Sequence, residues 1–209
     1  MLRFLIADDH SVVRKGVKQI LSEAFPSSVI VEVSNGEDLL KKATAEEWDA
    51  VISDISMPGR SGLEILQQVR QDHPKLPFLI LSIHSEDQYA IRVLKAGASG
   101  YLNKESVPEE LVKAINQILL GRKYITSSIA EKLASTLDKD AEKSPHEYLS
   151  DREFEVFKLL SAGKSVSEVA EKIFLGVTTV STYRARIMVK MDLKTNADLT
   201  LYAIEHKLL

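Results

Sequence analysis

The 209-residue sequence has no cysteine, one tryptophan, six prolines and nine glycines. Without cysteine the chain has no disulfide and no thiolate metal site, so any bound metal ion must use oxygen or histidine ligands. No stretch reaches the roughly eighteen apolar residues of a transmembrane helix, and the apolar start of the chain is too short for a signal-peptide core. We therefore expect a soluble, cytoplasmic protein.

The chain also lacks a strong excess of either charge, with 27 Lys and Arg against 30 Asp and Glu. A hydrophobic content of 44% is enough for packed cores, and the length fits one large or two small domains. One local stretch, residues 172–191, has no acidic residue and carries all of these basic ones: Lys172, Arg184, Arg186 and Lys190. This positive stripe is a candidate for contact with nucleic acid.

Short apolar runs alternate with amphipathic stretches of helical length over residues 1–121. The predicted strands are 3–8, 29–33, 50–54, 78–82 and 100–102, and the predicted helices are 11–24, 36–46, 62–72, 86–96 and 107–120. Turn residues such as Asn35-Gly36 and Pro58-Gly59 fall between these elements. Five β/α repeats with short connections predict an α/β fold with a doubly wound, five-stranded parallel sheet.

Acidic residues follow two of these strands. Asp8 and Asp9 end the first apolar run, and Asp54 ends the third. Ligand sites in open α/β sheets lie beyond the carboxyl ends of the strands, so these three carboxylates are expected to share one pocket. Crowded carboxylates repel one another unless a divalent cation neutralises them, and oxygen ligands suit Mg²⁺.

A hydroxyl and an ammonium group are expected at the same edge. Ser82 ends the fourth apolar run, and Lys104 follows the fifth. Each has a polar group that can hold one phosphoryl oxygen while Asp54 attacks the phosphorus. The pocket therefore predicts phosphoryl transfer.

With these residues in place, residues 1 to about 120 resemble the receiver domain of two-component response regulators. The acid pair, the segment Ser-Asp-Ile-Ser-Met-Pro-Gly around Asp54, the hydroxyl, the aromatic and the lysine occur in the receiver order. The resemblance implies that Asp54 is the phospho-acceptor and that Mg²⁺ is the cofactor. It also implies the remaining roles: Asp9, Asp54 and the backbone carbonyl of Ser56 ligate the metal, Asp8 acts through water, Ser82 and Tyr101 form the switch, and Lys104 binds the phosphoryl group.

Simpler interpretations stay open for single residues of this set. Asp9 could be a helix cap or a turn residue, Lys104 a solvated surface lysine, and Tyr101 a core residue. Ser56 and His84 flank the expected path of a water that removes the phosphoryl group, although His84 could equally be an exposed loop residue. A phosphatase of the haloacid-dehalogenase type is a rival for the whole domain, but that class has a second Asp where this chain has Ser56.

Residues 122–146 are predicted to be a linker that carries a possible short helix near 126–137. The stretch from Asp138 to Pro145 is charged and nearly free of large apolar groups, as interdomain linkers are. The predicted domains are therefore a receiver at 1–121 and a small helical domain at 147–209.

The pattern after the linker is entirely helical. Ser150 and Glu153 have capping-box spacing for a first helix, which Gly163 ends, and a second helix is predicted from Ser165 to Ile173. Leu175-Gly176-Val177 then forms a turn, Thr178 caps a third helix that runs to about Met191, and a fourth covers 196–206. Two short helices joined by a tight turn have the spacing of a helix-turn-helix.

The third of these helices has two distinct faces. Val180, Ile187 and Met191 share a core-facing stripe. The opposite side and its flanks supply the predicted DNA-binding residues, which are Thr178, Ser181, Thr182, Tyr183, Arg184, Arg186 and Lys190. Short hydroxyl side chains let a helix approach base edges, and basic groups fix it to phosphates.

Residues 147–209 resemble the LuxR-type domain in Leu-Ser-Asp-Arg-Glu at 149–153 and in Thr-Val-Ser-Thr-Tyr-Arg-Ala-Arg-Ile at 179–187. A receiver followed by this domain is the layout of the NarL/FixJ family. The resemblance implies a phosphorylation-dependent transcriptional regulator whose chemistry is limited to its own phosphoryl transfer and autodephosphorylation. Its implied partners are a sensor histidine kinase, a near-palindromic double-stranded promoter site and a second copy when phosphorylated, and RNA polymerase is a further candidate. A receiver that signals through protein contacts alone, with the helical tail as an adaptor, is the remaining alternative.

Several positions depart from the patterns of these families, among them one in each predicted domain. Tyr183 stands where the LuxR-type pattern commonly has His, and Glu105 stands where a proline often follows the receiver lysine. A cis peptide between Lys104 and Glu105 would carry the non-proline penalty of about 2.5–4 kcal/mol.

Overall fold

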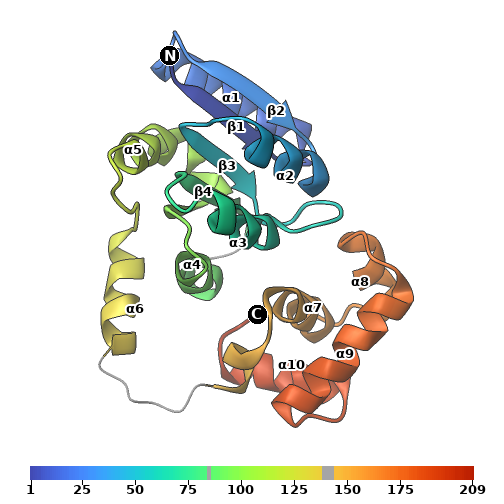
Figure 1. Ribbon diagram of the computed structural model, residues 1–209. Coiled ribbons are helices and arrows are strands. Elements are labelled where there is room, and N and C mark those ends of the chain that lie inside the picture. The colour runs from blue at the N-terminus through green and yellow to red at the C-terminus, as the bar shows by residue number, and fades with distance from the viewer. Residues whose placement is uncertain (84–85, 138–143) are drawn as a thin grey trace. The chain divides into compact units, whose positions relative to one another are not determined.

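The computed structural model describes residues 1–83, 86–137 and 144–209 (Figure 1). The chain divides into two compact units, Met1–Lys139 and Asp140–Leu209. Most of the charged stretch predicted as an interdomain linker lies outside the described residues.

The first unit contains a five-stranded parallel sheet with the strand order β2-β1-β3-β4-β5. The strands are β1 Arg3–Ala7, β2 Val29–Val33, β3 Ala50–Asp54, β4 Phe78–Ser82 and β5 Gly100–Asn103. The helices that alternate with them are α1 Ser11–Ala24, α2 Gly36–Ala45, α3 Gly62–Asp72, α4 Glu86–Lys95 and α5 Val107–Leu119. The predicted doubly wound fold is confirmed, and each predicted element is present with ends displaced by at most one residue.

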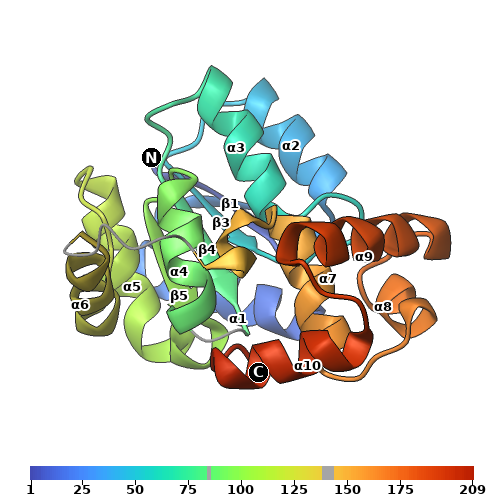
Figure 2. The same cartoon turned by 90° about the horizontal axis from the view of Figure 1, so that it is seen from below.

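Helices cover both faces of the sheet, with α1 and α5 on one face and α2 and α3 on the other (Figures 1 and 2). The central strands are therefore buried on both sides: Phe4, Leu5 and Ile6 of β1 are fully buried. Strand β2 is at the edge and begins at the exposed Val29. The parallel arrangement brings the carboxyl ends of all five strands to one edge, where the polar residues of the candidate site are located.

The segment between α5 and the next helix contacts the edge of the sheet. Tyr124, which is buried, forms an isolated parallel bridge with Gly100 at the start of β5. Helix α6, Ser127–Leu137, follows and packs against α4, with Ile129 buried.

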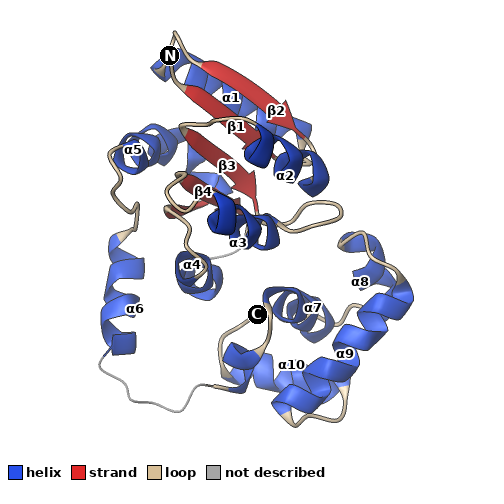
Figure 3. Cartoon of the chain, in the orientation of Figure 1, coloured by secondary structure: helices blue, strands red, loops and turns tan. Residues whose placement is uncertain are grey.

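The second unit is all helical, as the secondary-structure colours of Figure 3 show. It contains a 3₁₀ helix, Pro145–Tyr148, followed by α7 Asp151–Ser161, α8 Val166–Lys172, α9 Val177–Met191 and α10 Asn196–Glu205. Capping boxes start α7 at Ser150, α8 at Ser165 and α10 at Thr195.

Helix α9 begins differently from the prediction. Its N-cap is Gly176, which has an extended backbone, and the first helical residue is Val177. Thr178 therefore lies inside the first turn, where its carbonyl accepts a hydrogen bond from Thr182 Oγ1 at 3.0 Å. The prediction that Thr178 caps this helix is wrong, because Gly176 adopts the cap conformation without a side chain.

Among the described residues, no helix is both long and apolar enough to cross a membrane.

Candidate functional site

The three acidic residues predicted to share a pocket lie together at the carboxyl ends of β1 and β3. These two strands are neighbours, with Ala7 paired to Ser53, so Asp8 and Asp54 follow directly at the same edge. Asp8 is 1% exposed and Asp54 is 3% exposed, whereas Asp9 is half-buried. The pocket therefore holds two carboxylates that have almost no contact with water.

Lys104 supplies the positive charge that this pair needs. Its Nζ lies 2.6 Å from Asp54 Oδ2 and 2.9 Å from Asp8 Oδ2, and its side chain is 8% exposed. The residue begins a 3₁₀ turn, Lys104–Ser106, that directly follows β5. All peptide bonds of the described residues are trans, including the bond between Lys104 and Glu105.

Burial also shifts the pKa values of the ionisable groups in the pocket. Removal from water raises the pKa of Asp54 from 3.8 to about 6, with Lys104 opposing the shift and Asp8 adding to it. Burial lowers the pKa of Lys104, but Asp54 and Asp8 outweigh that effect and raise it. The Lys104 ammonium is therefore held in its charged form. The negative charge of the ionised Asp54 carboxylate is only partly neutralised by the groups around it.

The oxygen atoms of the pocket fit a divalent cation. Two buried oxygens, Asp8 Oδ2 and Asp9 Oδ1, have the nitrogens of ion pairs as their near partners, Lys104 Nζ at 2.9 Å and His10 Nδ1 at 2.7 Å. Ligand atoms of Asp8, Asp9, His10 and Asp54 all lie within 4.8 Å of one another. Hard carboxylate oxygens of this kind are suited to Mg²⁺.

His10 was not among the predicted site residues. It follows the acid pair and is the N-cap of α1, and its Nδ1 lies 2.7 Å from Asp9 Oδ1 and 3.3 Å from Asp8 Oδ1. Its position next to two acids was the only signal for it in the sequence. Ser56, a predicted metal ligand through its carbonyl, donates its backbone N–H to Asp54 Oδ1 at 3.3 Å.

The two predicted switch residues lie on adjacent strands near the pocket. Ser82 ends β4 beside β3, and Tyr101 is on β5, paired with Ile80. Both are fully buried, so the Tyr101 ring lies inside the domain in this structure. His84 lies outside the described residues.

Helix α9 has the two faces that the sequence predicted. Val180, Ile187 and Met191 are buried, and α9 packs on α7 and α8. The exposed residues of the helix include Thr178, Ser181, Thr182, Ala185, Arg186 and Lys190, while Tyr183 and Arg184 are half-buried.

Two of the predicted DNA-binding residues make contacts within their own domain. Arg184 Nε donates to Asn196 Oδ1 at 2.7 Å, which ties α9 to the start of α10. Lys190 Nζ lies 2.6 Å from Glu153 Oε2, and the Glu153 side chain is 4% exposed. Within the described residues, Arg186 has no such partner.

Asp54→Asn is expected to stabilise the metal-free first unit at pH 8. The folded-state pKa of Asp54 lies above its unfolded value, so its favourable contribution is complete below pH 3.8 and is lost as the pH rises through about 6. A shift of this size corresponds to about 1–3 kcal/mol at pH 8, and the two proteins should be equally stable near pH 4. Urea unfolding without metal at the two pH values measures this, and a variant that is less stable at pH 8 would contradict it.

Comparisons with known proteins identify the family of each unit. Residues 4–116 match the response regulator receiver domain family, and residues 147–203 match the luxR family of bacterial regulatory proteins. Response regulator UvrY of Escherichia coli strain K12 is 35% identical over 209 residues, covering 100% of this chain and 96% of its own length. Response regulator GacA of Pseudomonas aeruginosa is 33% identical over 207 residues, covering 99% of this chain and 97% of its own length.

Solved structures of RcsB are also similar. RcsB from Salmonella enterica serovar Typhimurium, bound to promoter rprA in the presence of phosphomimetic BeF3⁻, is 24% identical with a TM-score of 0.64, covering 97% of this chain and 98% of that one. A structure of two RcsB dimers bound to two parallel DNAs is 25% identical with a TM-score of 0.59, covering 96% and 97% of the two chains. Both similarities extend across the two units of the chain.

Proposed function

This chain belongs to the NarL/FixJ family of two-component response regulators, and we propose that Asp54 is the residue that accepts its phosphoryl group. The protein is a phosphorylation-dependent transcriptional regulator, with a receiver domain and a LuxR-type DNA-binding domain. The observation that carries the assignment of Asp54 is its position. It is a buried carboxylate, 2.6 Å from a lysine ammonium and beside a second buried carboxylate.

The remaining receiver residues have complementary roles. Asp9, Asp54 and the backbone carbonyl of Ser56 would hold Mg²⁺, with Asp8 acting through water; when bound, this ion neutralises the carboxylates and the phosphoryl oxygens. Asp54 attacks the phosphorus of a phosphohistidine on a sensor kinase, so that an acyl phosphate O–P bond forms and the N–P bond breaks. The Lys104 ammonium then exchanges its contact with Asp54 for one with a phosphoryl oxygen.

The new phosphoryl group alters the receiver surface through the switch residues. It adds about −1.5 to −2 charges beside Asp54 and offers strong acceptor oxygens. The Ser82 hydroxyl donates to one of them, and Tyr101, which is buried beside β4, repacks in response. Autodephosphorylation follows when water attacks the acyl phosphate, and Ser56 lies two residues from the acceptor, where it can affect the path of that water.

The LuxR-type domain reads DNA with α9. Ser181 and Thr182 are exposed and short, so they can approach base edges in the major groove, and Thr178 and Tyr183 flank them. A phosphorylated homodimer would place two such helices about 34–36 Å apart on a near-palindromic site. The structure of two RcsB dimers bound to two parallel DNAs supports DNA binding by a dimer. RNA polymerase is the remaining proposed partner, and the cytoplasm, where the promoters are, is the proposed location.

DNA binding and mass in solution test the whole mechanism. Beryllofluoride with Mg²⁺ should tighten binding to promoter sites and produce dimers in the wild type, and Asp54→Asn should abolish both responses. Footprinting on the promoters of the source organism and light scattering provide the two measurements. Specific DNA binding that is indifferent to the mimic and to Asp54 would retain the DNA-binding function and exclude the phosphorylation switch.

Arg186→Ala and Lys190→Ala are expected to weaken DNA binding for different reasons. Arg186 is exposed and lacks a partner in the described structure, so its loss should reduce the slope of log K against log salt by about one.

Lys190 neutralises the buried Glu153, so its loss should lower the melting temperature of the second unit and leave the slope of log K against log salt unchanged. Fluorescence anisotropy over a salt series and calorimetric melting separate the two. An unchanged melting temperature for Lys190→Ala would assign Lys190 to phosphate contact.

A further inference from the structure

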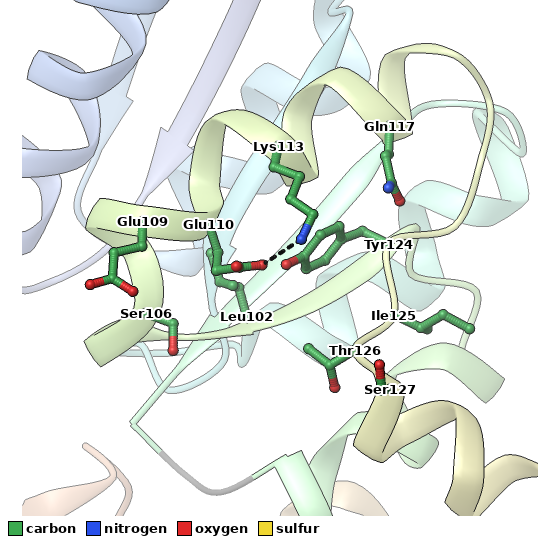
Figure 4. A pocket seen from close by; sticks show the side chains of 10 residues that line it. All are labelled: Leu102, Ser106, Glu109, Glu110, Lys113, Gln117, Tyr124, Ile125, Thr126 and Ser127. Atoms are coloured by element: carbon green, nitrogen blue, oxygen red, sulfur yellow. Dashed lines mark ion pairs between the residues drawn. The ribbon is translucent and has the colours of Figure 1, made fainter.

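A pocket of about 540 Å³ lies between α5, β5 and the segment that leads to α6 (Figure 4). All of its lining residues fall between Leu102 and Ser127, and none of them belongs to the acid pocket at Asp54. The lining is mixed, since Leu102 is apolar whereas Ser106 and Gln117 supply a hydroxyl and an amide. Small-molecule sites typically have volumes of about 300–1,000 Å³, so the pocket is large enough to hold a small polar ligand.

Tyr124 places a polar group without a protein partner at this pocket. The residue is 2% exposed and lines the pocket, and its hydroxyl has no hydrogen-bond partner among the described residues. In Figure 4 the hydroxyl points toward Glu110 and Lys113 of α5. The backbone of Tyr124 is held in place, because its N–H donates to the Ser99 carbonyl at 2.8 Å and it bridges to Gly100. Buried hydroxyls nearly always have a partner, so this one is a fixed donor and acceptor for a molecule in the pocket.

A carboxylate and an ammonium group lie on the side of the pocket that this hydroxyl faces. Glu110 is in the first turn of α5, where the helix dipole favours a negative charge, and Lys113 follows three residues later. Glu110 Oε2 and Lys113 Nζ are 3.6 Å apart, and their side chains are 32% and 62% exposed. An exposed pair of this kind contributes little to stability, so it can open at small cost when the charges of a ligand replace it. The pocket therefore offers one charge of each sign to a ligand.

A ligand that matches these groups carries both charges close together. An α-amino acid has its ammonium and carboxylate on one carbon, so its ammonium can bind Glu110 while its carboxylate binds Lys113 and the Tyr124 hydroxyl. A ligand with a single charge would instead bring that charge close to the residue of like sign. We propose that this pocket binds a free α-amino acid, with Leu102 contacting its side chain, which gives the receiver a ligand other than the phosphoryl group.

Thermal unfolding and calorimetric titration of the full chain with the common α-amino acids, each added alone, test the proposal. The best of them should raise the melting temperature of the receiver. It should also bind at least about tenfold more tightly than the amine and the carboxylate analogues that each lack one of its charged groups, because a hydrogen bond to a charged group is worth that factor or more.

Three variants test where the amino acid binds. Tyr124→Phe removes only the hydroxyl and should lower the affinity about 3–10-fold, and Lys113→Gln should lower it about tenfold. Lys15→Gln is the matched control, since it removes an exposed lysine of α1 that does not line the pocket, and it should not change the affinity.

The single-charge analogues test the orientation of the ligand. Glu110→Gln should weaken binding of the amine analogue and spare the carboxylate analogue, and Lys113→Gln should do the reverse. Equal affinities for the amino acid and its amine analogue would overturn the assignment of an α-amino acid. The proposal would also be overturned if no amino acid raised the melting temperature, or if Tyr124→Phe and Lys113→Gln left the affinity unchanged. None of these outcomes bears on the proposed role of Asp54.

Discussion

Gly62→Ala is expected to destabilise the receiver by more than about 3 kcal/mol, at the upper end of the cost of an overpacked core. Gly62 is the first residue of α3, and an added Cβ would lie 2.1 Å from the backbone oxygen of Asp54 and 2.8 Å from Ser53 Oγ. These atoms belong to a buried strand and are held by hydrogen bonds: Ser53 Oγ donates to the Asp54 carbonyl, and the Gly62 N–H donates to the Ile55 carbonyl. Relief of the clash must therefore move the end of β3, which carries Asp54, the proposed phospho-acceptor.

Denaturant unfolding combined with phosphoryl uptake from acetyl phosphate measures both consequences for Gly62→Ala. Gly16→Ala is the matched control, because Gly16 lies inside α1 with no atom within 4 Å of an added Cβ. This control should stabilise the receiver by about 0.5–1 kcal/mol through the helical propensity of alanine. Gly62→Ala with wild-type stability would show that β3 and α3 adjust easily.

Lys104→Met is expected to destabilise the metal-free receiver by about 3–5 kcal/mol at pH 8, the usual cost of removing one partner of a buried ion pair. Asp8 and Asp54, at 1% and 3% exposure, would then repel each other without a nearby cation. Since Lys104 is the main influence that lowers the pKa of Asp54, its loss should raise that pKa above about 6. The destabilisation should therefore be greatest at high pH and should diminish as the pH falls and a carboxylate takes up a proton.

Urea unfolding between pH 5 and pH 8 measures the effect of Lys104→Met. The double variant Lys104→Met with Asp54→Asn removes one of the two repelling charges and should recover most of the lost stability. Saturating Mg²⁺ should do the same for the single variant, because binding to the folded state alone stabilises it. A Lys104→Met protein with the same stability at both pH values would exclude repulsion between the carboxylates as the cause.

The sheet and the main part of the pocket could be predicted because they follow from the order of elements along the chain. Parallel strands place their carboxyl ends at one edge, so Asp8, Asp54 and Lys104 had to meet wherever the five strands formed. The core stripe of α9 was predictable for a similar reason, since Val180, Ile187 and Met191 recur at helical spacing.

The features that the sequence did not predict depend on contacts between distant residues or on single backbone torsions. The partners of Lys190 and Arg184 come from α7 and α10, 37 and 12 residues away, and no local pattern indicates them. His10 joins the pocket because the turn after β1 directs its ring back to the acids. The start of α9 was misplaced because Gly176 serves as a cap without a side chain to identify it.

Residues of α9 that bond to other helices and residues that are only exposed differ in how freely evolution can replace them. Arg184 and Lys190 are tied to α10 and α7, so a change at either position alters the scaffold of the domain as well as its charge. Ser181, Thr182 and Ala185 are exposed, and substitutions there leave the packed core untouched. With α9 as the proposed reader of DNA, a duplicated gene could acquire a new set of target promoters through a few exposed positions of one helix, while its stability and its receiver are inherited unchanged.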